Sequence, residues 1–251
     1  MSTTSSPLVS IIVRTKDRPT YLRRALRDIQ AQSMPSWECV LVNDGGDAAV
    51  VAQIVDEMGE SFRAKTTVID SSESRGRWRS ANAGVLASRG DLLILHDDDD
   101  TWDADFLERA ADYLSTHPER VAVVSRIEIV WEARDGDDFT EERRELFQGH
   151  LTAPSLSDTL LFNRFVPIGF LYRRSLHEEH GLYDESLPVV GDWAFNLKVL
   201  SHAELEYLPG GPAVQWRQRS GSSGADGNSV IDAEEAHRAG DARLRAAALR
   251  D

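Results

Sequence analysis

Short apolar runs alternate with longer amphipathic stretches along most of the chain. The short runs are rich in Val, Ile and Leu, end at polar turns and are typical of strands; they lie at 8–13, 38–43, 66–70, 91–96 and 121–131. The longer stretches carry apolar residues at helical spacing; they lie at 19–32, 47–59, 79–90 and 104–117. Regular alternation of strand and helix predicts an α/β protein with a mostly parallel central sheet flanked by helices on both faces.

The second half of the chain is less regular. Residues 132–158 mix charged residues with turn formers, which predicts a long loop or a mobile excursion. From residue 166 onward the sequence predicts a further strand, two short helices and a final strand. A glycine and serine stretch then predicts a flexible loop, and residues 226–251 predict a helical tail on the surface, while residues 1–7 are expected to be disordered.

Composition and charge narrow the range of partners. A length of 251 residues with 41% hydrophobic content supports one large domain or two small ones. The net charge of −14 argues against nucleic acid and against adsorption to an anionic membrane. The single cysteine, Cys39, lies in an apolar run and predicts a buried thiol. The sequence has no apolar run long enough for a membrane span and no signal-like N-terminus, so we expect a cytoplasmic location.

Polar clusters follow three of the predicted strands, at 14–19, 43–47 and 96–100. Ligands of parallel sheets bind at the carboxyl ends of strands, so these clusters predict one shared site. The last cluster contains four consecutive aspartates, 97–100, whose mutual repulsion favours a cation or a hydrogen-bonding ligand. Asp97 and Asp99 project to the same side of an extended segment, while the alternative is an acidic turn that caps a helix.

Four segments, in this order, resemble family-2 inverting glycosyltransferases of the GT-A fold. They are VSIIVRTKDRPTYLRRAL, VLVNDGGD, SANAGVLASRGDLLILHDDDDTW and GLYDESLPVVGDW, and the resemblance runs from Val9 to about Ser223. It implies a single Rossmann-like GT-A domain over residues 8–225, with a nucleotide-sugar half at about 8–102, an acceptor half at about 103–225 and the tail at 226–251. The 132–158 segment would then be a mobile wall of the acceptor groove.

The resemblance also implies the substrates and the metal site. The donor would be a nucleoside-diphosphate sugar held with a divalent metal, Mn²⁺ or Mg²⁺, and the acceptor a hydroxyl of a glycan or glycolipid, in bacterial surface polysaccharide synthesis. Asp97 would contact the sugar or ribose and the metal, and Asp99 the metal. Asp98 and Asp100 would support the site or cap a helix starting near Trp102. Membrane-bound partners are possible associates, and the sequence leaves the oligomeric state open.

The nucleoside end and the diphosphate have their own expected contacts. Asp44 resembles the carboxylate that accepts a hydrogen bond from the base, with Thr15 close by. Arg77 aligns with an arginine near the base or phosphates, and Arg75 and Arg79 compete for that role. Arg219 stands where many relatives have a histidine at the metal or diphosphate, and a guanidinium group binds phosphate oxygens in a bidentate manner.

Inversion needs a carboxylate that makes the acceptor hydroxyl nucleophilic. The segment GDWAFNL resembles the family's Glu-Asp-Trp-Asp-Leu stretch, which gives Asp192 as the catalytic base, with Gly191 in place of the glutamate. A helix N-cap is the alternative role for Asp192, and Asp184 is interpreted as a turn former.

Two alternative functions are carried forward. One is a haloacid-dehalogenase-like phosphohydrolase with Asp97 as nucleophile and Asp99 as acid, which would need a later lysine before an acidic metal motif. The other is a non-catalytic module that binds a metal or a sugar nucleotide.

Overall fold

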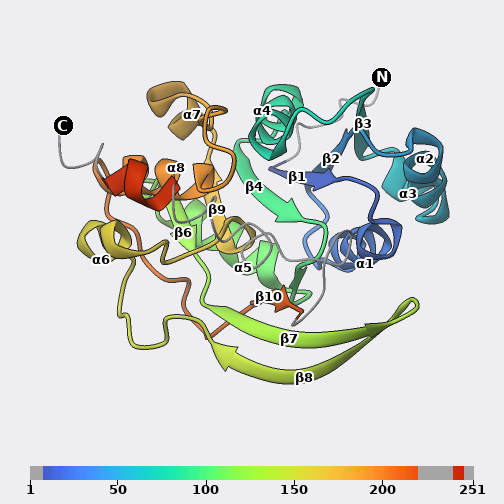
Figure 1. Ribbon diagram of the computed structural model, residues 1–251. Coiled ribbons are helices and arrows are strands. Elements are labelled where there is room, and N and C mark those ends of the chain that lie inside the picture. The colour runs from blue at the N-terminus through green and yellow to red at the C-terminus, as the bar shows by residue number, and fades with distance from the viewer. Residues whose placement is uncertain (1–7, 220–239, 246–251) are drawn as a thin grey trace.

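The computed structural model describes residues 8–219 and 240–245, and within them the chain forms two sheets. The first sheet has the strand order β3-β2-β1-β4-β9-β6 (Figure 1). Its strands are β1 (Val9–Thr15), β2 (Trp37–Asp44), β3 (Thr66–Ser71), β4 (Leu92–Asp97), β6 (Ala122–Val124) and β9 (Phe170–Arg173). Strands β1 to β4 are parallel to one another, and β9 runs antiparallel to both of its neighbours, β4 and β6. The predicted α/β class with a mostly parallel sheet is confirmed.

Helices cover this sheet and place their ends beside the strand ends. They are α1 (Pro19–Gln30), α2 (Ala48–Glu57), α3 (Glu60–Arg63), α4 (Arg77–Ala87), α5 (Phe106–Thr116), α6 (Leu156–Leu161), α7 (Ser175–His180) and α8 (Gly191–Leu200), with a 3₁₀ turn at Pro167–Gly169. Helix α4 lies directly on β1, because a Cβ atom at Gly84 would come within 2.3 Å of the Ile12 side chain. This close approach brings the first turn of α4 to the carboxyl end of β1.

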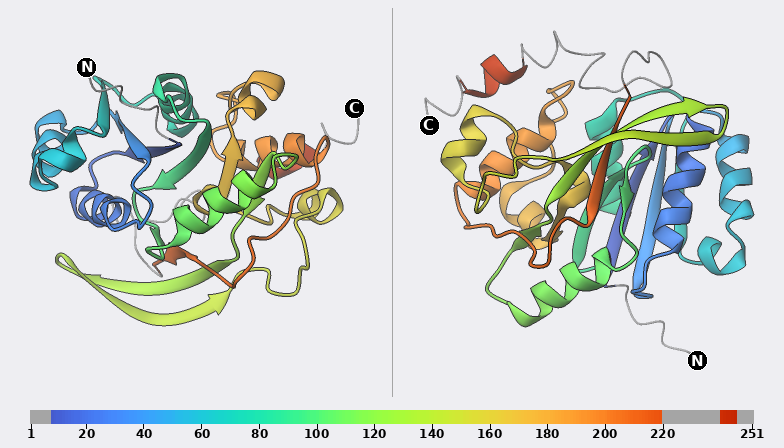
Figure 2. Two further views of the ribbon diagram at one scale, coloured as in Figure 1. Left: turned by 180° about the vertical axis from the view of Figure 1, so that it is seen from behind. Right: turned by 90° about the horizontal axis from the view of Figure 1, so that it is seen from below.

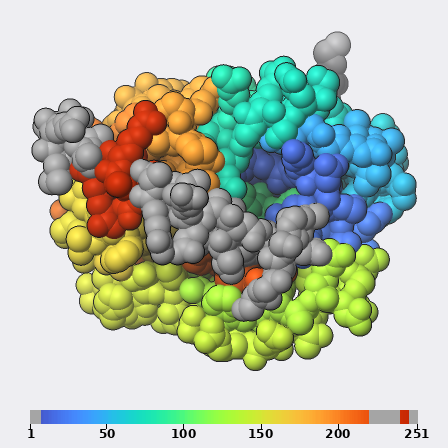
Figure 3. All heavy atoms as spheres, viewed as in Figure 1, coloured from blue at the N-terminus to red at the C-terminus, as the bar shows by residue number. Residues whose placement is uncertain are grey.

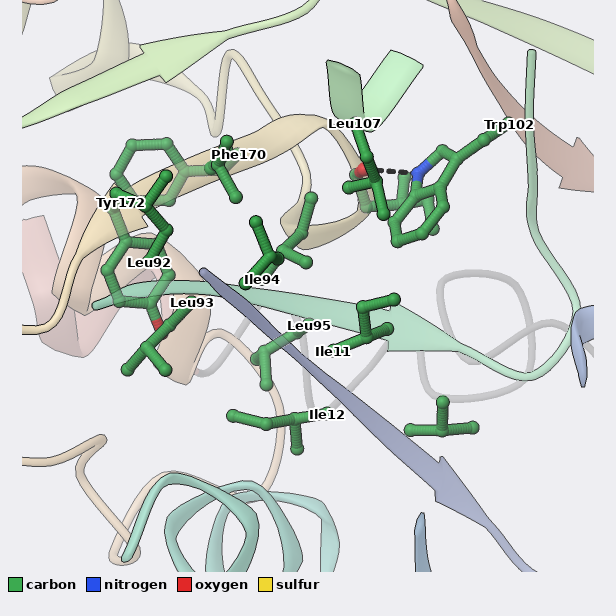
Figure 4. Packing of buried hydrophobic residues seen from close by; sticks show 14 of the residues in the cluster. Ile11, Ile12, Leu92, Leu93, Ile94, Leu95, Trp102, Leu107, Phe170 and Tyr172 are labelled. Atoms are coloured by element: carbon green, nitrogen blue, oxygen red, sulfur yellow. Dashed lines mark hydrogen bonds between the residues drawn. The ribbon is translucent and has the colours of Figure 1, made fainter. Parts of the chain in front are cut away.

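The core lies between the central strands and these helices. Figure 4 shows Ile11 and Ile12 of β1 beside Leu93 and Leu95 of β4, and all four side chains are at most 1% exposed. Trp102 closes one end of this core and donates its indole N–H to the Ile168 carbonyl at 2.8 Å. Strands β1 and β4 are therefore fixed by packing right up to the polar residues that follow them.

The second sheet corrects two expectations. Its order is β5-β10-β7-β8, with β5 (Thr101–Trp102), β7 (Ile127–Asp135), β8 (Asp138–Leu146) and β10 (Val214–Gln218). The predicted loop at 132–158 was wrong, because β7 and β8 form a long hairpin over most of it. The predicted strand at 121–131 is two strands, β6 and β7, that belong to different sheets. Strand β8 is exposed and charged almost throughout, so it lacks the apolar alternation by which strands are recognised.

The hairpin runs beside β10 along one side of the molecule (Figures 1 and 2). Its turn reaches α1, where Thr20 donates to Asp137 at 2.6 Å and Phe139 packs on Tyr21. These contacts anchor the segment that was expected to be mobile.

The termini lie mostly outside the described residues, and this includes the expected disorder of residues 1–7. Of the tail predicted at 226–251, residues 240–245 are described and helical. Leu244 packs there on a small apolar cluster that contains Val190 and Trp193. Over residues 8–219 and 240–245, none of the helices has the length and apolar character needed to cross a membrane.

Candidate functional site

A cleft of about 470 Å³ opens at the carboxyl ends of β1, β2 and β4. Figure 3 shows this face hollowed between the segments coloured dark blue and teal. Its lining residues come from all three of the polar clusters predicted to meet, from the start of α4 and the loop before it, and from Pro188. They are Arg14, Thr15, Lys16, Arg18, Asp44, Ser74, Gly76, Arg77, Ser80, Asp97, Asp98, Asp99 and Pro188. Four basic and four acidic residues therefore face one another in an otherwise acidic protein.

Asp97 and Asp98 are each held by a residue that follows or ends β1. Asp97, with 37% of its side chain exposed, forms an ion pair with Arg14. Asp98 is buried and accepts hydrogen bonds from Thr15 at 2.7 Å and Arg18 at 2.8 Å. Burial raises the pKa of Asp98 to about 6, although Arg18 opposes the shift. Thr15, expected near the nucleoside, thus lies in the cleft wall and braces the aspartate turn.

Asp99 lies between two arginines. One of its oxygens accepts from Arg18 at 2.9 Å and from Arg219 at 2.5 Å. Burial would raise the pKa of Asp99, but these two guanidinium groups hold it at about 2. Arg219 is 3% exposed and contacts Asp99 rather than lining the cleft, so its expected contact with a diphosphate stays a prediction.

Asp100 does not cap a helix. It is buried, it accepts from the backbone N–H of Arg217 at 2.8 Å, and burial raises its pKa well above the usual range. The helix expected near Trp102 begins at Phe106, after the short strand β5. In the turn formed by the four aspartates, Asp97, Asp98 and Asp99 line the cleft, whereas Asp100 is buried and does not line it.

The nucleoside side is formed by Asp44 and the loop before α4. Asp44 accepts from the Ser74 hydroxyl at 2.8 Å and from the Arg75 and Gly76 amides at 2.7 and 3.2 Å. Burial raises the pKa of Asp44, but these hydrogen bonds outweigh it and the pKa is lowered. Asp44 thus orders the loop that leads to Arg77, and its contact with a base stays a prediction.

The three competing arginines separate in space. Arg77 lines the cleft, and burial together with the nearby Arg14 lowers its pKa. Arg75 and Arg79 line a neighbouring cavity of about 590 Å³, where Arg79 pairs with Glu185 at 2.9 Å. Arg77 is thus the one of these three positioned to meet a ligand in the cleft.

Asp192 lies in the first turn of α8, after the helix has begun at Gly191, so it is not the N-cap. Its carboxylate accepts from the Asn163 side chain at 2.8 Å. Burial raises its pKa, while the Trp193 amide and the cleft residues Arg77 and Arg14 oppose the shift. A raised carboxylate pKa is what a general base requires, and Asp192 lies within electrostatic reach of the cleft. Asp184 accepts from the Ser186 amide at 2.8 Å, as expected of a turn former.

Gly191, the departure beside Asp192, has a steric cause. A Cβ atom at this position would lie 2.6 Å from the Trp78 ring. Trp78 comes from α4 and donates its indole N–H to the Val189 carbonyl at 2.8 Å. Trp78 therefore occupies the space that a longer side chain at 191 would need.

The carboxylate oxygens in the cleft suit a hard divalent cation that would also bind oxygen atoms of a ligand. Among the described residues, no group of three or more His, Cys, Asp or Glu side chains could hold a metal by itself. Asp97 and Asp99 each keep one carboxylate oxygen without a protein partner in that part of the chain. Mg²⁺ sites commonly use one or two carboxylates plus substrate phosphates and water, so two such oxygens fit.

Three residues of this site escaped sequence reasoning. Arg18 stood within the first polar cluster and could have been singled out as a cation near the aspartates. Asn163 and Glu132, the buried partner of Arg219 at 3.2 Å, gave no signal, because neither belongs to a motif or to a regular apolar pattern in the sequence.

Comparison with known proteins agrees with this architecture. Residues 10–181 match the family model described as Glycosyl transferase family 2. An uncharacterized glycosyltransferase of Bacillus subtilis, YwdF, is 31% identical over 203 residues, covering 80% of this chain and 71% of its own. A PGL/p-HBAD biosynthesis glycosyltransferase of Mycobacterium bovis is 28% identical over 203 residues, covering 80% of this chain and 73% of its own.

Solved structures show the same fold. TarS of S. aureus, residues 1–349 in complex with UDP, superposes with a TM-score of 0.68 at 19% identity, over 95% of this chain and 64% of that one. The mannosyltransferase PcManGT of Pyrobaculum calidifontis, in complex with GDP-Man and Mn²⁺, gives 0.67 at 19% identity, over 99% of this chain and 66% of that one. This chain therefore spans somewhat under two thirds of the TarS fragment. With a family model that matches more than half of its length, the chain belongs to glycosyl transferase family 2 and has the GT-A fold.

Proposed function

We propose that this glycosyltransferase moves a hexosyl group, with inversion and with the help of a divalent cation, from a nucleoside-diphosphate donor to a hydroxyl of a glycan or glycolipid. The observation that carries the proposal is the arrangement of the cleft. Its arginine and lysine side chains face the aspartate turn, and Asp192 is within electrostatic reach of these arginines. The names of the relatives favour polysaccharide or glycolipid synthesis, and work in the cytoplasm alongside membrane-bound partners is part of the proposal.

Donor binding would use the basic side of the cleft. A diphosphate carries two or more negative charges, and Arg14, Lys16, Arg18 and Arg77 offer it cationic N–H donors from β1, the β1–α1 loop and α4. A Mn²⁺ or Mg²⁺ ion held by Asp97 and Asp99 would neutralise the charge that grows on the leaving diphosphate. Asp44 would accept from the base while it keeps the loop of Arg77 in place.

The acceptor would be activated by Asp192. Its carboxylate takes the proton of the acceptor hydroxyl as that oxygen bonds to the anomeric carbon. The bond from this carbon to the diphosphate oxygen breaks, and its electron pair leaves with the nucleoside diphosphate. The raised pKa makes Asp192 a stronger base than an exposed aspartate, and the Asn163 amide fixes its orientation.

A thermal-shift screen tests the donor half of this proposal. UDP, GDP and dTDP are each added with and without Mn²⁺, and a nucleotide that binds the native state raises the melting temperature. We expect one of them to give a larger shift with Mn²⁺ than without. No shift from any nucleotide would refute nucleotide-sugar chemistry.

Turnover separates the enzyme from the alternatives. A non-catalytic module would bind the nucleotide and release no nucleoside diphosphate from its sugar nucleotide in the presence of acceptors. The phosphohydrolase alternative needs a lysine that follows the aspartates in the chain. Lys198 is the lysine at such a position, and it donates to the His180 carbonyl at 2.8 Å. Release of inorganic phosphate from simple phosphate esters would favour that alternative.

A further inference from the structure

Glu132 is a buried carboxylate on the hairpin. Its side chain is fully buried, and it lies where the pairing of β7 with β8 is irregular, between Trp131 and Glu132. A buried ionised carboxylate is costly unless cations and hydrogen bonds surround it. Three guanidinium groups do so: Arg24 of α1 at 2.9 Å, Arg217 of β10 at 2.9 Å and Arg219 at 3.2 Å.

Each of these arginines also contacts the turn that carries the aspartates. Arg24 donates to the Asp99 carbonyl at 2.5 Å, and Arg217 donates to the Thr101 hydroxyl at 2.9 Å. Arg219 donates to the Asp99 carboxylate at 2.5 Å. Each of the three arginines therefore connects Glu132 to the aspartate turn or to Thr101, which follows it.

The aromatic ring of Tyr21 supports the same arrangement. The Arg219 guanidinium lies 4.6 Å from the centre of this ring, and Arg24 lies 5.7 Å from it. Arg24 also stacks on Phe139 of the hairpin at 3.8 Å. Planar guanidinium groups held by a carboxylate on one edge and a ring on one face have little rotational freedom.

We propose that Glu132 is a positioning residue for the metal and diphosphate site. It fixes the fork of Arg219, which in turn fixes the Asp99 carboxylate so that its other oxygen faces the cleft. This inference rests on the proposed function, since it takes Asp99 as a metal ligand. Partners that orient a ligating carboxylate commonly change metal affinity about 10–100-fold when they are removed.

The test compares two substitutions of one kind on one hairpin. Glu132→Gln keeps the shape and removes the charge that binds the arginines. Glu141→Gln is the matched control, because Glu141 pairs with Glu132 across the strands but is exposed and bound to Arg144. Mn²⁺ is titrated in the presence of whichever of UDP, GDP and dTDP binds the wild type, and the melting temperature is measured.

For Glu132→Gln, we expect the Mn²⁺ concentration at half-maximal nucleotide stabilisation to rise about 10–100-fold. It should stay at the wild-type value for Glu141→Gln. A purely structural Glu132 would lower the melting temperature of the free protein and leave the Mn²⁺ midpoint unchanged, which would overturn the inference.

If Glu132→Gln does not fold, Arg219→Lys tests the same inference through the arginine that Glu132 positions. It retains the charge and loses the planar fork, so the Mn²⁺ midpoint should rise in the same direction. A wild-type midpoint in this variant would overturn the inference. Failure of the proposed function looks different, since the wild type itself would then show no nucleotide stabilisation that depends on Mn²⁺.

Discussion

Replacement of Asp192 by asparagine should separate turnover from stability. The substitution keeps the size of the side chain and leaves an oxygen that can accept from Asn163, which now contacts the carboxylate at 2.8 Å. It removes the charge that burial disfavours and the basicity that proton transfer needs. Loss of the buried charge should raise stability, whereas loss of the basicity should lower the rate of turnover.

Loss of the base sets the kinetic magnitude. A positioned general base contributes about 10²–10⁴-fold, which is about 2.7–5.5 kcal/mol in the barrier. We expect kcat to fall by that factor with donor affinity unchanged, because the residues proposed to bind the donor lie on β1, β2, β4, α4 and the loops after β1 and β4, and not on α8.

The stability effect follows from the raised pKa. The folded state holds the Asp192 proton more tightly than the unfolded state, whose pKa is about 3.9. Asp192 therefore favours folding below that value, and its contribution is lost as pH rises towards the folded pKa. At pH 7 the wild type carries the full cost of the buried charge, so Asp192→Asn should melt at an equal or higher temperature there.

Two assays decide the outcome. Release of nucleoside diphosphate measures turnover, and thermal unfolding at pH 7 and pH 4 measures stability, with the advantage of Asp192→Asn shrinking at the lower pH. The wild-type rate should also fall as pH drops through the raised pKa. Transfer at a near wild-type rate by Asp192→Asn would refute the role of Asp192 and direct attention to Asp184 or Glu185.

Three further substitutions test other parts of the site. Asp99→Asn should abolish the Mn²⁺-linked nucleotide shift. It should also cost about 1–3 kcal/mol of stability, because Arg18 and Arg219 each lose one of their two carboxylate partners. An unchanged Mn²⁺-linked shift would contradict its role as a ligand. Gly191→Ala should lower the free energy of unfolding by about 1–3 kcal/mol through overpacking against Trp78. Trp78→Phe in the same chain should recover part of this loss, and an unchanged melting temperature in Gly191→Ala would contradict the contact. Arg77→Met should weaken nucleotide binding by about 1.5–3 kcal/mol, whereas Arg79→Met, the control on the neighbouring cavity, should not; equal effects would contradict the assignment.

The doubly wound half of the fold could be predicted because its signals are local. The buried strands are mostly apolar runs, helix α1 has one apolar stripe, and polar residues begin where β1 and β4 end. The same rule predicted that Asp44 and Asp97 meet in one cleft, whereas Arg77, in the first turn of α4, was expected there only from the family resemblance. The hairpin could not be predicted in this way, because β8 is exposed on both faces and is held by backbone pairing and cross-strand ion pairs such as Arg144 with Glu128 at 2.7 Å.

The contacts within the site were less predictable than its location. An aspartate in a motif does not reveal whether its nearest cation is a metal or an arginine, and the arginines of Asp99 come from positions 81 and 120 residues away in the chain. The Asp99 side chain is only 14% exposed and forms two ion pairs, so its replacement is predicted to cost stability as well as metal binding.

Gly191 and Arg219, the two positions expected to differ from the family motif, each have a partner that lies far away in the sequence. Trp78 of α4 fills the space beside Gly191. Glu132 on the hairpin binds the guanidinium of Arg219. The two members of each pair share a space or an ion pair, so we expect their substitutions to be coupled in their effect on stability. Exchange of one member alone, whether Gly191 for glutamate or Arg219 for histidine, should therefore cost more than exchange of the pair.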